Sequence, residues 1–93
     1  MDEEDWLFEM CSGRAAWTIA PKTDLGINLA EVGARIAAAG WTITLENRLC
    51  WTFTGSCDLT LYPSGKLLIK TDTAETAREI GRRHLREWLT VDA

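Results

Sequence analysis

The sequence predicts an α+β fold: a five-stranded antiparallel sheet with two helices on one face, in the order strand, helix, four strands, helix. Three observations support it: apolar and threonine residues alternate in the candidate strands, two helical segments begin with capping residues, and turns containing Gly or Pro separate the elements. Because neighbouring strand residues point to opposite faces, the alternation predicts an aromatic core face and a hydroxyl-lined open face. The alternating pairs are Trp17-Thr18, Trp41-Thr42, Ile43-Thr44, Trp51-Thr52, Phe53-Thr54 and Leu59-Thr60.

The chain is long enough for one domain and too short for two. Its 93 residues are 46% hydrophobic and include five tryptophans, which is sufficient for one core. We expect a single domain over residues 1–93, with an N-terminal arm at residues 1–13 and the α+β core at residues 14–89. Acidic and apolar residues are mixed in the arm, so that neither the helical nor the strand period is satisfied.

The charge balance and the cysteine count indicate which partners and which cellular location to expect. Fourteen acidic and ten basic residues give a formal net charge of -4, which disfavours nucleic acid as a partner. No apolar run reaches membrane-spanning length, and the chain opens with the acidic residues 2–5 where a secretory signal is basic. We therefore expect a cytoplasmic protein without membrane contact. Three cysteines, an odd number, indicate reduced thiols rather than a disulfide framework.

The first strand and the first helix have clear boundaries. Residues 14–20 alternate as a strand that Pro21 ends, and a loop follows. Asn28 and Glu31 have the spacing of a capping box, so a helix begins there, and Gly40 is placed to end it just after the C-cap. We expect this helix to pack closely on the sheet, because its apolar side includes alanines and a glycine.

Four strands follow, and the hairpin at Gly55 decides which residues share a face. We expect strands at residues 41–45, 49–54, 57–62 and 67–71. A two-residue loop would put Leu59 on the threonine face, whereas a three-residue loop over residues 54–56 puts it with Trp51 and Phe53. The second register gathers the large apolar residues on one face, so we prefer it.

The last helix has an apolar stripe and a charged face. Asp72 and Glu75 form a second capping box at its start. The stripe that faces the sheet contains Ala77, Ile80, Gly81, His84, Leu85 and Trp88. We expect His84 to be a buried or half-buried packing residue, since the nearby carboxylates project to other faces. On the opposite face, arginines and glutamates are spaced for helical ion pairs: Arg78, Arg82 and Arg86 with Glu75, Glu79 and Glu87.

Part of the chain resembles a known family. Residues 60–71 read TLYPSGKLLIKT and precede a helix with Arg82-Arg83-His84, and this segment resembles the Ser-Gly-Lys hairpin and following helix of one repeat of the TATA-binding protein. Residues 27–32 are similar to that repeat's entry into its first helix. The resemblance covers roughly residues 14–89 and implies a half-saddle fold whose concave sheet face bends DNA.

Three features depart from that DNA-bending pattern. One repeat is present where the family has two, and threonines line the open face where the family carries larger aliphatic residues. Of the two expected aromatic wedges Tyr62 alone matches, and we place the acidic residues Asp58 and Glu46 on the same face. We therefore expect a small non-enzymatic binding or interaction module, with nucleic-acid binding of the TATA-binding-protein type as an alternative.

The candidate binding patch lies on the open sheet face, where the apolar Leu68 stands among polar residues. The patch consists of Cys50, Thr52, Thr60, Tyr62, Leu68 and Lys70. A simply solvated face is the competing interpretation. We expect the module to act as a homodimer or to bind another protein, because the strand at residues 14–20 has no hairpin partner and could be an edge strand, and edge strands are commonly paired or covered.

No cofactor, metal site or catalytic residue is indicated. In the preferred register Cys50 and Cys57 lie on opposite faces, and they lack the Cys-x-x-Cys spacing of structural zinc sites, so His84 would have no co-ligands. We expect Cys57 to be a core residue and Cys50 a free thiol. A thiol-dependent enzyme or carrier that uses Cys50 or Cys11 is the remaining alternative, and it requires a thiol that is reactive at neutral pH.

Overall fold

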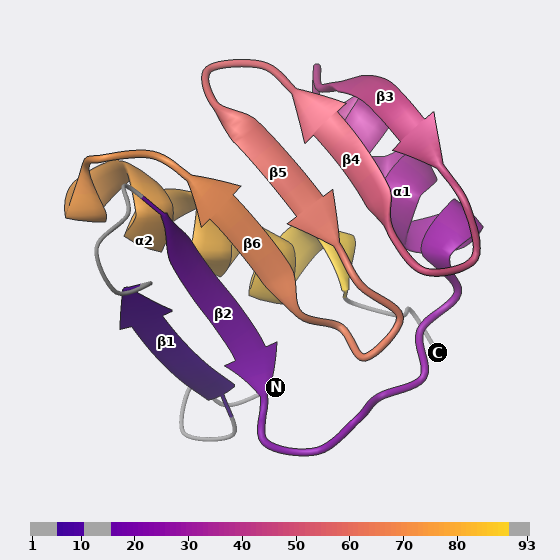
Figure 1. The fold of residues 1–93 in the computed structure, drawn as a ribbon, viewed down its shortest axis with the longest axis horizontal. Helices are drawn as coiled ribbons and strands as arrows, with labels where there is room; N and C mark the ends of the chain where they lie inside the picture. The colour runs from indigo at the N-terminus through magenta and orange to yellow at the C-terminus, as the bar shows by residue number, and fades with distance from the viewer. Residues whose placement is uncertain (1–5, 11–15, 90–93) are drawn as a thin grey trace.

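The fold is one layer of six antiparallel strands with the helices packed on one face (Figure 1). The computed structural model describes residues 6–10 and 16–89, and side chains from residue 16 to residue 89. The strands are β1 (Trp6–Met10), β2 (Trp17–Pro21), β3 (Thr42–Glu46), β4 (Trp51–Thr54), β5 (Asp58–Leu61) and β6 (Leu67–Lys70). The helices are α1 (Leu29–Ala38), α2 (Ala74–Arg83) and the π-helical turn η2 (His84–Trp88), which continues α2. In the sheet the strand order is β1-β2-β6-β5-β4-β3.

The predicted α+β class is confirmed, with all five expected strands and both helices, and β1 adds a sixth strand. It lies in the expected N-terminal arm and pairs with β2, so that Trp6 is opposite Pro21 and Met10 is opposite Trp17. Because β2 lies between β1 and β6, the prediction that it is an edge strand is wrong. The sequence does not indicate β1, because three consecutive apolar residues, Trp6 to Phe8, interrupt the alternation that is typical of a strand. The edges of the sheet are β1 and β3.

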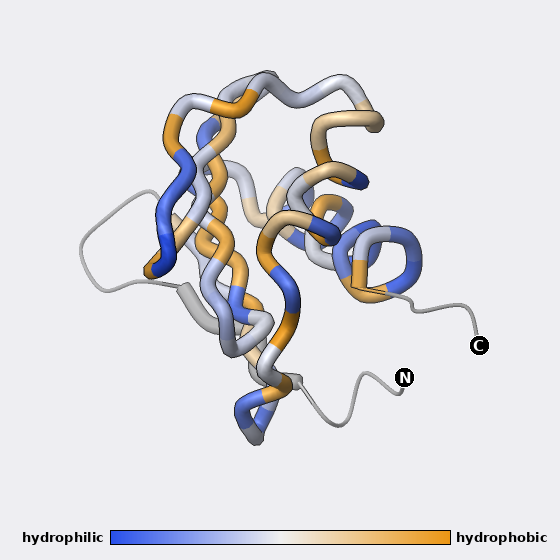
Figure 2. Tube along the Cα trace, turned by 90° about the vertical axis from the view of Figure 1, so that its right-hand side faces the viewer, coloured by the Kyte–Doolittle hydropathy of each residue, from blue (hydrophilic) through white to orange (hydrophobic). Residues whose placement is uncertain are grey.

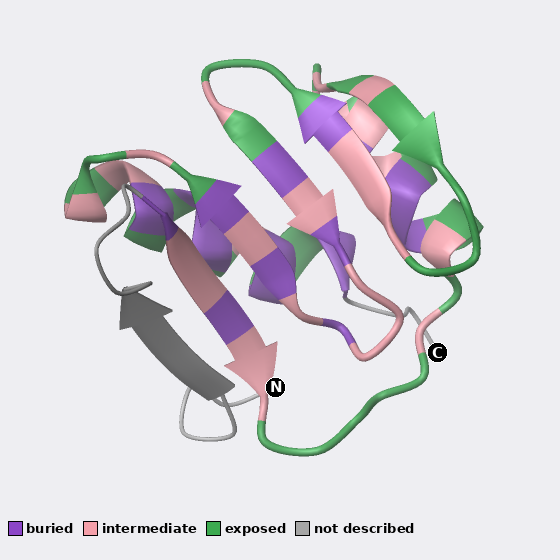
Figure 3. Ribbon diagram, viewed as in Figure 1, coloured by how far each residue is buried: buried purple, intermediate pink, exposed green. Residues whose placement is uncertain are grey.

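Burial alternates along the central strands and gives the sheet its two faces. Residues that face the helices are largely buried, whereas their neighbours are half-buried or exposed (Figure 3). Viewed from the side, both helices lie on the same side of the sheet (Figure 2). The core between them is formed by Ile19, Val32, Ile36, Phe53, Leu59, Leu61, Leu67, Ile69, Ala77, Ile80, Leu85, Trp88 and Leu89.

Helix α1 begins and ends as predicted, but α2 does not begin as predicted. Asn28 Oδ1 accepts a hydrogen bond from the backbone N–H of Glu31 at 3.1 Å, and Gly40, with a φ of +106°, follows the C-cap. The N-cap of α2 is Thr73, without a side-chain cap. The capping box expected at Asp72 is therefore wrong, because this one-residue shift puts Thr76 at the third helical position, where a capping box has Glu or Gln.

The β4–β5 hairpin has the predicted faces but a different register. Phe53 is opposite Leu59 and Trp51 is opposite Leu61, so these four residues share the helix-covered side. The loop covers residues 55–57 rather than 54–56. This difference slides the strands by two residues, which leaves every side chain on its predicted face.

The indole of Trp51 lies directly against the backbone of α1. A Cβ atom at Gly33 would be 2.7 Å from Cζ3 of Trp51, which is closer than van der Waals contact allows. At the other side of the helix, Arg35 donates a hydrogen bond to the carbonyl oxygen of Trp88 at 2.7 Å and another to Glu31 at 3.0 Å. These contacts fix α1 both to the sheet and to the end of η2.

We expect Gly33→Ala to lower the free energy of unfolding by about 1–2 kcal/mol, because the Trp51 ring has to move, although alanine favours the helix by about 1 kcal/mol. In a Trp51→Leu background the same change should instead be stabilising. Urea unfolding of the four proteins measures this coupling. Ala34→Gly, at an exposed position of α1, is the control and should cost only helix propensity. An equal effect of Gly33→Ala in both backgrounds would contradict the packing described here.

Candidate functional site

The predicted patch residues lie on or beside the open face of β4, β5 and β6, and the pairing of the strands places them next to one another. Leu68 is opposite Thr60, and Thr60 is opposite Thr52, which gives a row across three strands. Tyr62 directly follows β5 and Cys50 directly precedes β4. The two residues therefore come immediately after the last pair of these strands, Trp51 with Leu61. Lys70, at the end of β6, is opposite Asp58. The structure thus brings all six predicted residues onto one surface.

Hydrogen bonds and a cation–π contact order the side chains of this face. The hydroxyl oxygens of Thr44 and Thr52 are 2.6 Å apart, and Thr54 donates to Asp58 at 2.9 Å. The ammonium group of Lys66 is 4.4 Å from the centre of the Tyr62 ring. Direct side-chain contacts therefore connect neighbouring strands on the open face.

A β-bulge in β3 changes the composition of the open face. The register shifts between Ile43 and Leu45, so that Leu45 is opposite Thr52 and Glu46 is opposite Trp51. Leu45 therefore joins the open face, where it is 46% exposed, and Glu46 moves to the helix-covered side. The placement of Glu46 on the open face was wrong, because the alternation Ile43-Thr44-Leu45 contains no sign of an extra residue.

No helix crosses the open face in the part of the chain that the structure describes (Figures 1 and 2). Thr52, Thr60, Tyr62 and Leu68 are nevertheless half-buried, because their neighbours on adjacent strands shield them, whereas Lys70 is exposed. The face is therefore a closely packed, ordered surface with a central apolar residue.

A second feature, which no motif in the sequence indicates, is a shallow cavity of about 530 Å³, open to solvent, on the helix-covered side. Three separate segments form it, namely the entry into α1, the β3–β4 turn and the β5–β6 turn. Its lining residues are Ile27, Asn28, Leu29, Ala30, Glu46, Asn47, Arg48, Trp51 and Pro63. These residues are far apart in the sequence, and only the folded chain brings them together.

His84 is fully buried, as predicted, at the junction of α2 and η2. Its Nε2 is 2.8 Å from the carbonyl oxygen of Gly65, and since a carbonyl can only accept, Nε2 carries the hydrogen. Burial lowers the pKa of His84 to about 4, and the bond to Gly65 opposes this shift in part. The residue joins the β5–β6 turn to the helix as a neutral donor.

The charged face of the last helix contains a different ion pair from the predicted ones. Arg83 Nε lies 3.3 Å from a carboxylate oxygen of Glu87, and its guanidinium carbon lies 5.4 Å from the centre of the Trp88 ring. The Arg83 side chain therefore lies over the ring of Trp88, which is buried. We assign no ligand to this face.

The cysteines do not form a metal site in the described residues, among which no three His, Cys, Asp or Glu side chains come together. Cys57 packs partly buried against the core, as predicted, and Cys50 is a free thiol on the other side of the sheet. Burial, and then the charge of Asp58, raise the pKa of Cys57, with a hydrogen bond from Ser56 opposing the shift. Cys11 lies outside the described residues.

Comparisons with protein-family models, with curated proteins and with solved structures find no match to this chain. The resemblance to a TATA-binding-protein repeat thus remains a prediction. Among the helices within residues 16–89, none is long and apolar enough to cross a membrane.

We expect stability to fall in acid because of His84. Its pKa is lower in the folded than in the unfolded chain, so the unfolded state takes up the proton first; the contribution of His84 is complete above pH 6.5 and is lost as the pH falls toward 4. The loss amounts to about 3 kcal/mol over this window. His84→Gln retains an N–H donor for Gly65 but does not titrate, so its unfolding free energy should be flatter from pH 6.5 to 4. Parallel pH profiles of the two proteins in urea unfolding would contradict this assignment.

We expect Cys57 to react slowly with iodoacetamide near neutral pH, because its raised pKa leaves little thiolate and its side chain is partly buried. Alkylation followed by mass spectrometry should be several-fold slower in the folded chain than in urea. Asp58→Asn should accelerate it, whereas Asp24→Asn, in the distant loop before α1, should not. A folded-state rate equal to that of the unfolded thiol would refute the buried position of Cys57.

Proposed function

We propose that the protein is a non-enzymatic interaction module that binds a second copy of itself through the open sheet face. The main support is the β-bulge, which moves Leu45 onto this face and Glu46 off it. The row that crosses the sheet then consists of Thr18 on β2, Leu68 on β6, Thr60 on β5, Thr52 on β4 and Leu45 on β3, so that two threonines lie between its two leucines. Two apolar contacts separated by hydroxyl groups form a surface that two partners can bury without leaving polar atoms unpaired.

Threonine hydroxyls favour an identical partner. Each hydroxyl both donates and accepts hydrogen bonds, so a threonine face can pair with a copy of itself, as a twofold dimer requires. Threonine is also stiff at its first side-chain torsion, and its burial therefore costs little conformational entropy. The face is preorganised for such a contact.

The charges of this face do not oppose self-association. Although the chain has a net charge of -4, the part of the open face that β5, β6 and the turn between them form carries Lys66 and Lys70 against Asp58. Lys70 and Asp58 are opposite each other on neighbouring strands, so in a dimer each can also face its opposite charge on the partner. We expect a weak dimer with a dissociation constant on the order of 10 µM, because the contact has few apolar side chains.

Sedimentation velocity from roughly 1 to 100 µM should show a monomer that becomes a dimer. Leu68→Lys should raise the dissociation constant by roughly ten-fold or more, since it puts a charge at the centre of the contact. Leu49→Lys makes the same chemical change at a side chain that is 77% exposed in the β3–β4 turn, and it should leave the dimer intact.

A clean monomer over the whole range would refute self-association. Equal effects of the two lysine variants would show that the dimer forms elsewhere. If the chain instead shifts the mobility of duplex DNA, and the shift weakens with salt, the open face is a nucleic-acid surface of the kind that the family resemblance implies.

A further inference from the structure

The cavity beside the start of α1 is wide and open to solvent, and its volume and lining are compatible with a small molecule. Its volume of about 530 Å³ falls within the range of roughly 300–1,000 Å³ that is typical of ligand pockets. Apolar side chains from three segments line it, among them Ile27, Trp51 and Pro63. It lies on the helix-covered side of the sheet, so it is separate from the open face.

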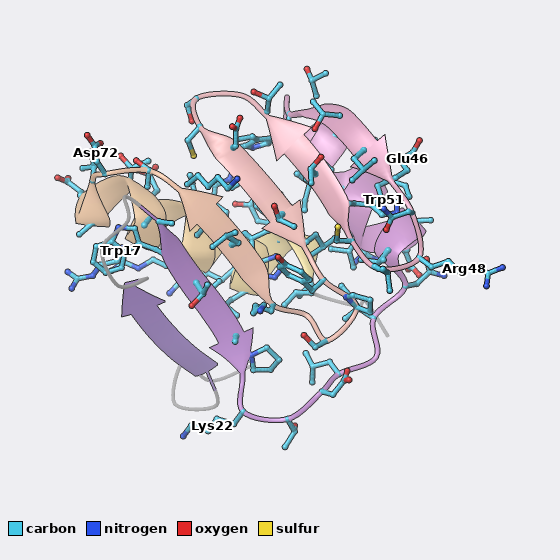
Figure 4. The ribbon with its side chains drawn as sticks, in the orientation of Figure 1. Trp17, Lys22, Glu46, Arg48, Trp51 and Asp72 are labelled. Carbon is cyan, nitrogen blue, oxygen red and sulfur yellow. The ribbon has the colours of Figure 1, made fainter. Side chains whose placement is uncertain are left out.

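The walls of this cavity are held in place from several directions. The N–H of Ile27 donates to the carbonyl oxygen of Pro63 at 2.8 Å, which joins the entry of α1 to the β5–β6 turn. The Trp51 indole rests on α1 at Gly33, where no side chain lies between them. Figure 4 shows Trp51 beside α1, with Glu46 and Arg48 at the same end of the sheet and Arg48 reaching beyond the turn. An aromatic wall fixed in this way offers a rigid apolar contact to a planar ring.

The polar groups around the cavity are mainly donors. Asn28 Oδ1 already accepts from the N–H of Glu31, and Asn47 Oδ1 accepts from the N–H groups of Leu49 and Cys50 at 2.8 and 2.9 Å. Asn47 Oδ1 thus has both lone pairs engaged and Asn28 Oδ1 has one, whereas both side-chain amides still have NH₂ groups that can donate. Arg48 adds a guanidinium that makes no ion pair with the described residues, and Glu46 is the single carboxylate in the lining. A donor-rich rim favours a ligand that carries acceptors.

We propose that this cavity binds a small molecule composed of a planar aromatic ring and one carboxylate. The ring occupies the apolar space between Trp51 and Pro63, and the carboxylate is bound by Arg48 and the free amide groups. Glu46 repels the carboxylate and limits the affinity. For a ligand of about a dozen non-hydrogen atoms in such an open site, we expect a dissociation constant on the order of 1 mM.

Titration with 2-naphthoate, followed by ¹H–¹⁵N NMR, tests this proposal. Resonances of residues 27–30 and 46–51, together with the indole N–H of Trp51, should shift and saturate. Arg48→Gln should weaken binding by roughly two- to five-fold, and Glu46→Gln should strengthen it by a similar factor. The uncharged 2-naphthamide has the same ring and shape, and it should bind more weakly than the acid.

Ala30→Leu should fill the cavity and abolish the shifts, whereas Ala38→Leu, exposed on the same helix but outside the cavity, should not. Unchanged binding by Ala30→Leu, or shifts that map to other residues, would refute the site. Equal affinity for acid and amide would refute the anionic ligand class. Because the cavity and the open face lie on opposite sides of the sheet, Leu68→Lys should leave the naphthoate titration unchanged, which separates this test from that of the dimer.

Discussion

The contact between the Trp51 indole and the backbone of α1 at Gly33 determines the arrangement of the molecule. It sets how closely the helix approaches the sheet, and no residue other than glycine leaves room for the ring. The hydrogen bond from Arg35 to the carbonyl oxygen of Trp88 then ties the same helix to η2, so that both helices cover one face. With both helices committed to that face, the threonine face stays uncovered.

The β-bulge in β3 is the second determinant, because it changes the chemistry of both faces at once. A regular strand would put Leu45 with the core residues and Glu46 among the threonines. The bulge reverses this placement, so the open face gains an apolar residue and loses a carboxylate, while the cavity gains that carboxylate. Bulges also twist an edge strand, and β3 is an edge strand, which disfavours uncontrolled pairing of its outer side.

The parts of this structure that local sequence specifies were predictable, and the parts that depend on pairing were not. Alternation of apolar residues with threonine revealed both faces, and Asn28 and Gly40 marked the ends of α1. Strand β1 was not predicted because residues 6–8 are all apolar and show no alternation. The bulge was not predicted because the sequence of β3 alternates as a regular strand does. The cavity could not be predicted for a different reason: its lining comes from three segments that only the folded chain brings together.

Strand β4 connects the two candidate surfaces. Trp51 forms a wall of the cavity, and its neighbour Thr52 lies in the central row of the open face. A shift of the strand register by one residue would therefore put Trp51 on the open face and Thr52 in the cavity wall. Phe53 prevents such a slip: it is 1% exposed, and moving it to the open face would place a phenyl ring in water and a threonine in the core. A single buried phenylalanine therefore keeps the aromatic and hydroxyl residues of this strand on their separate sides, and both surfaces depend on it without containing it.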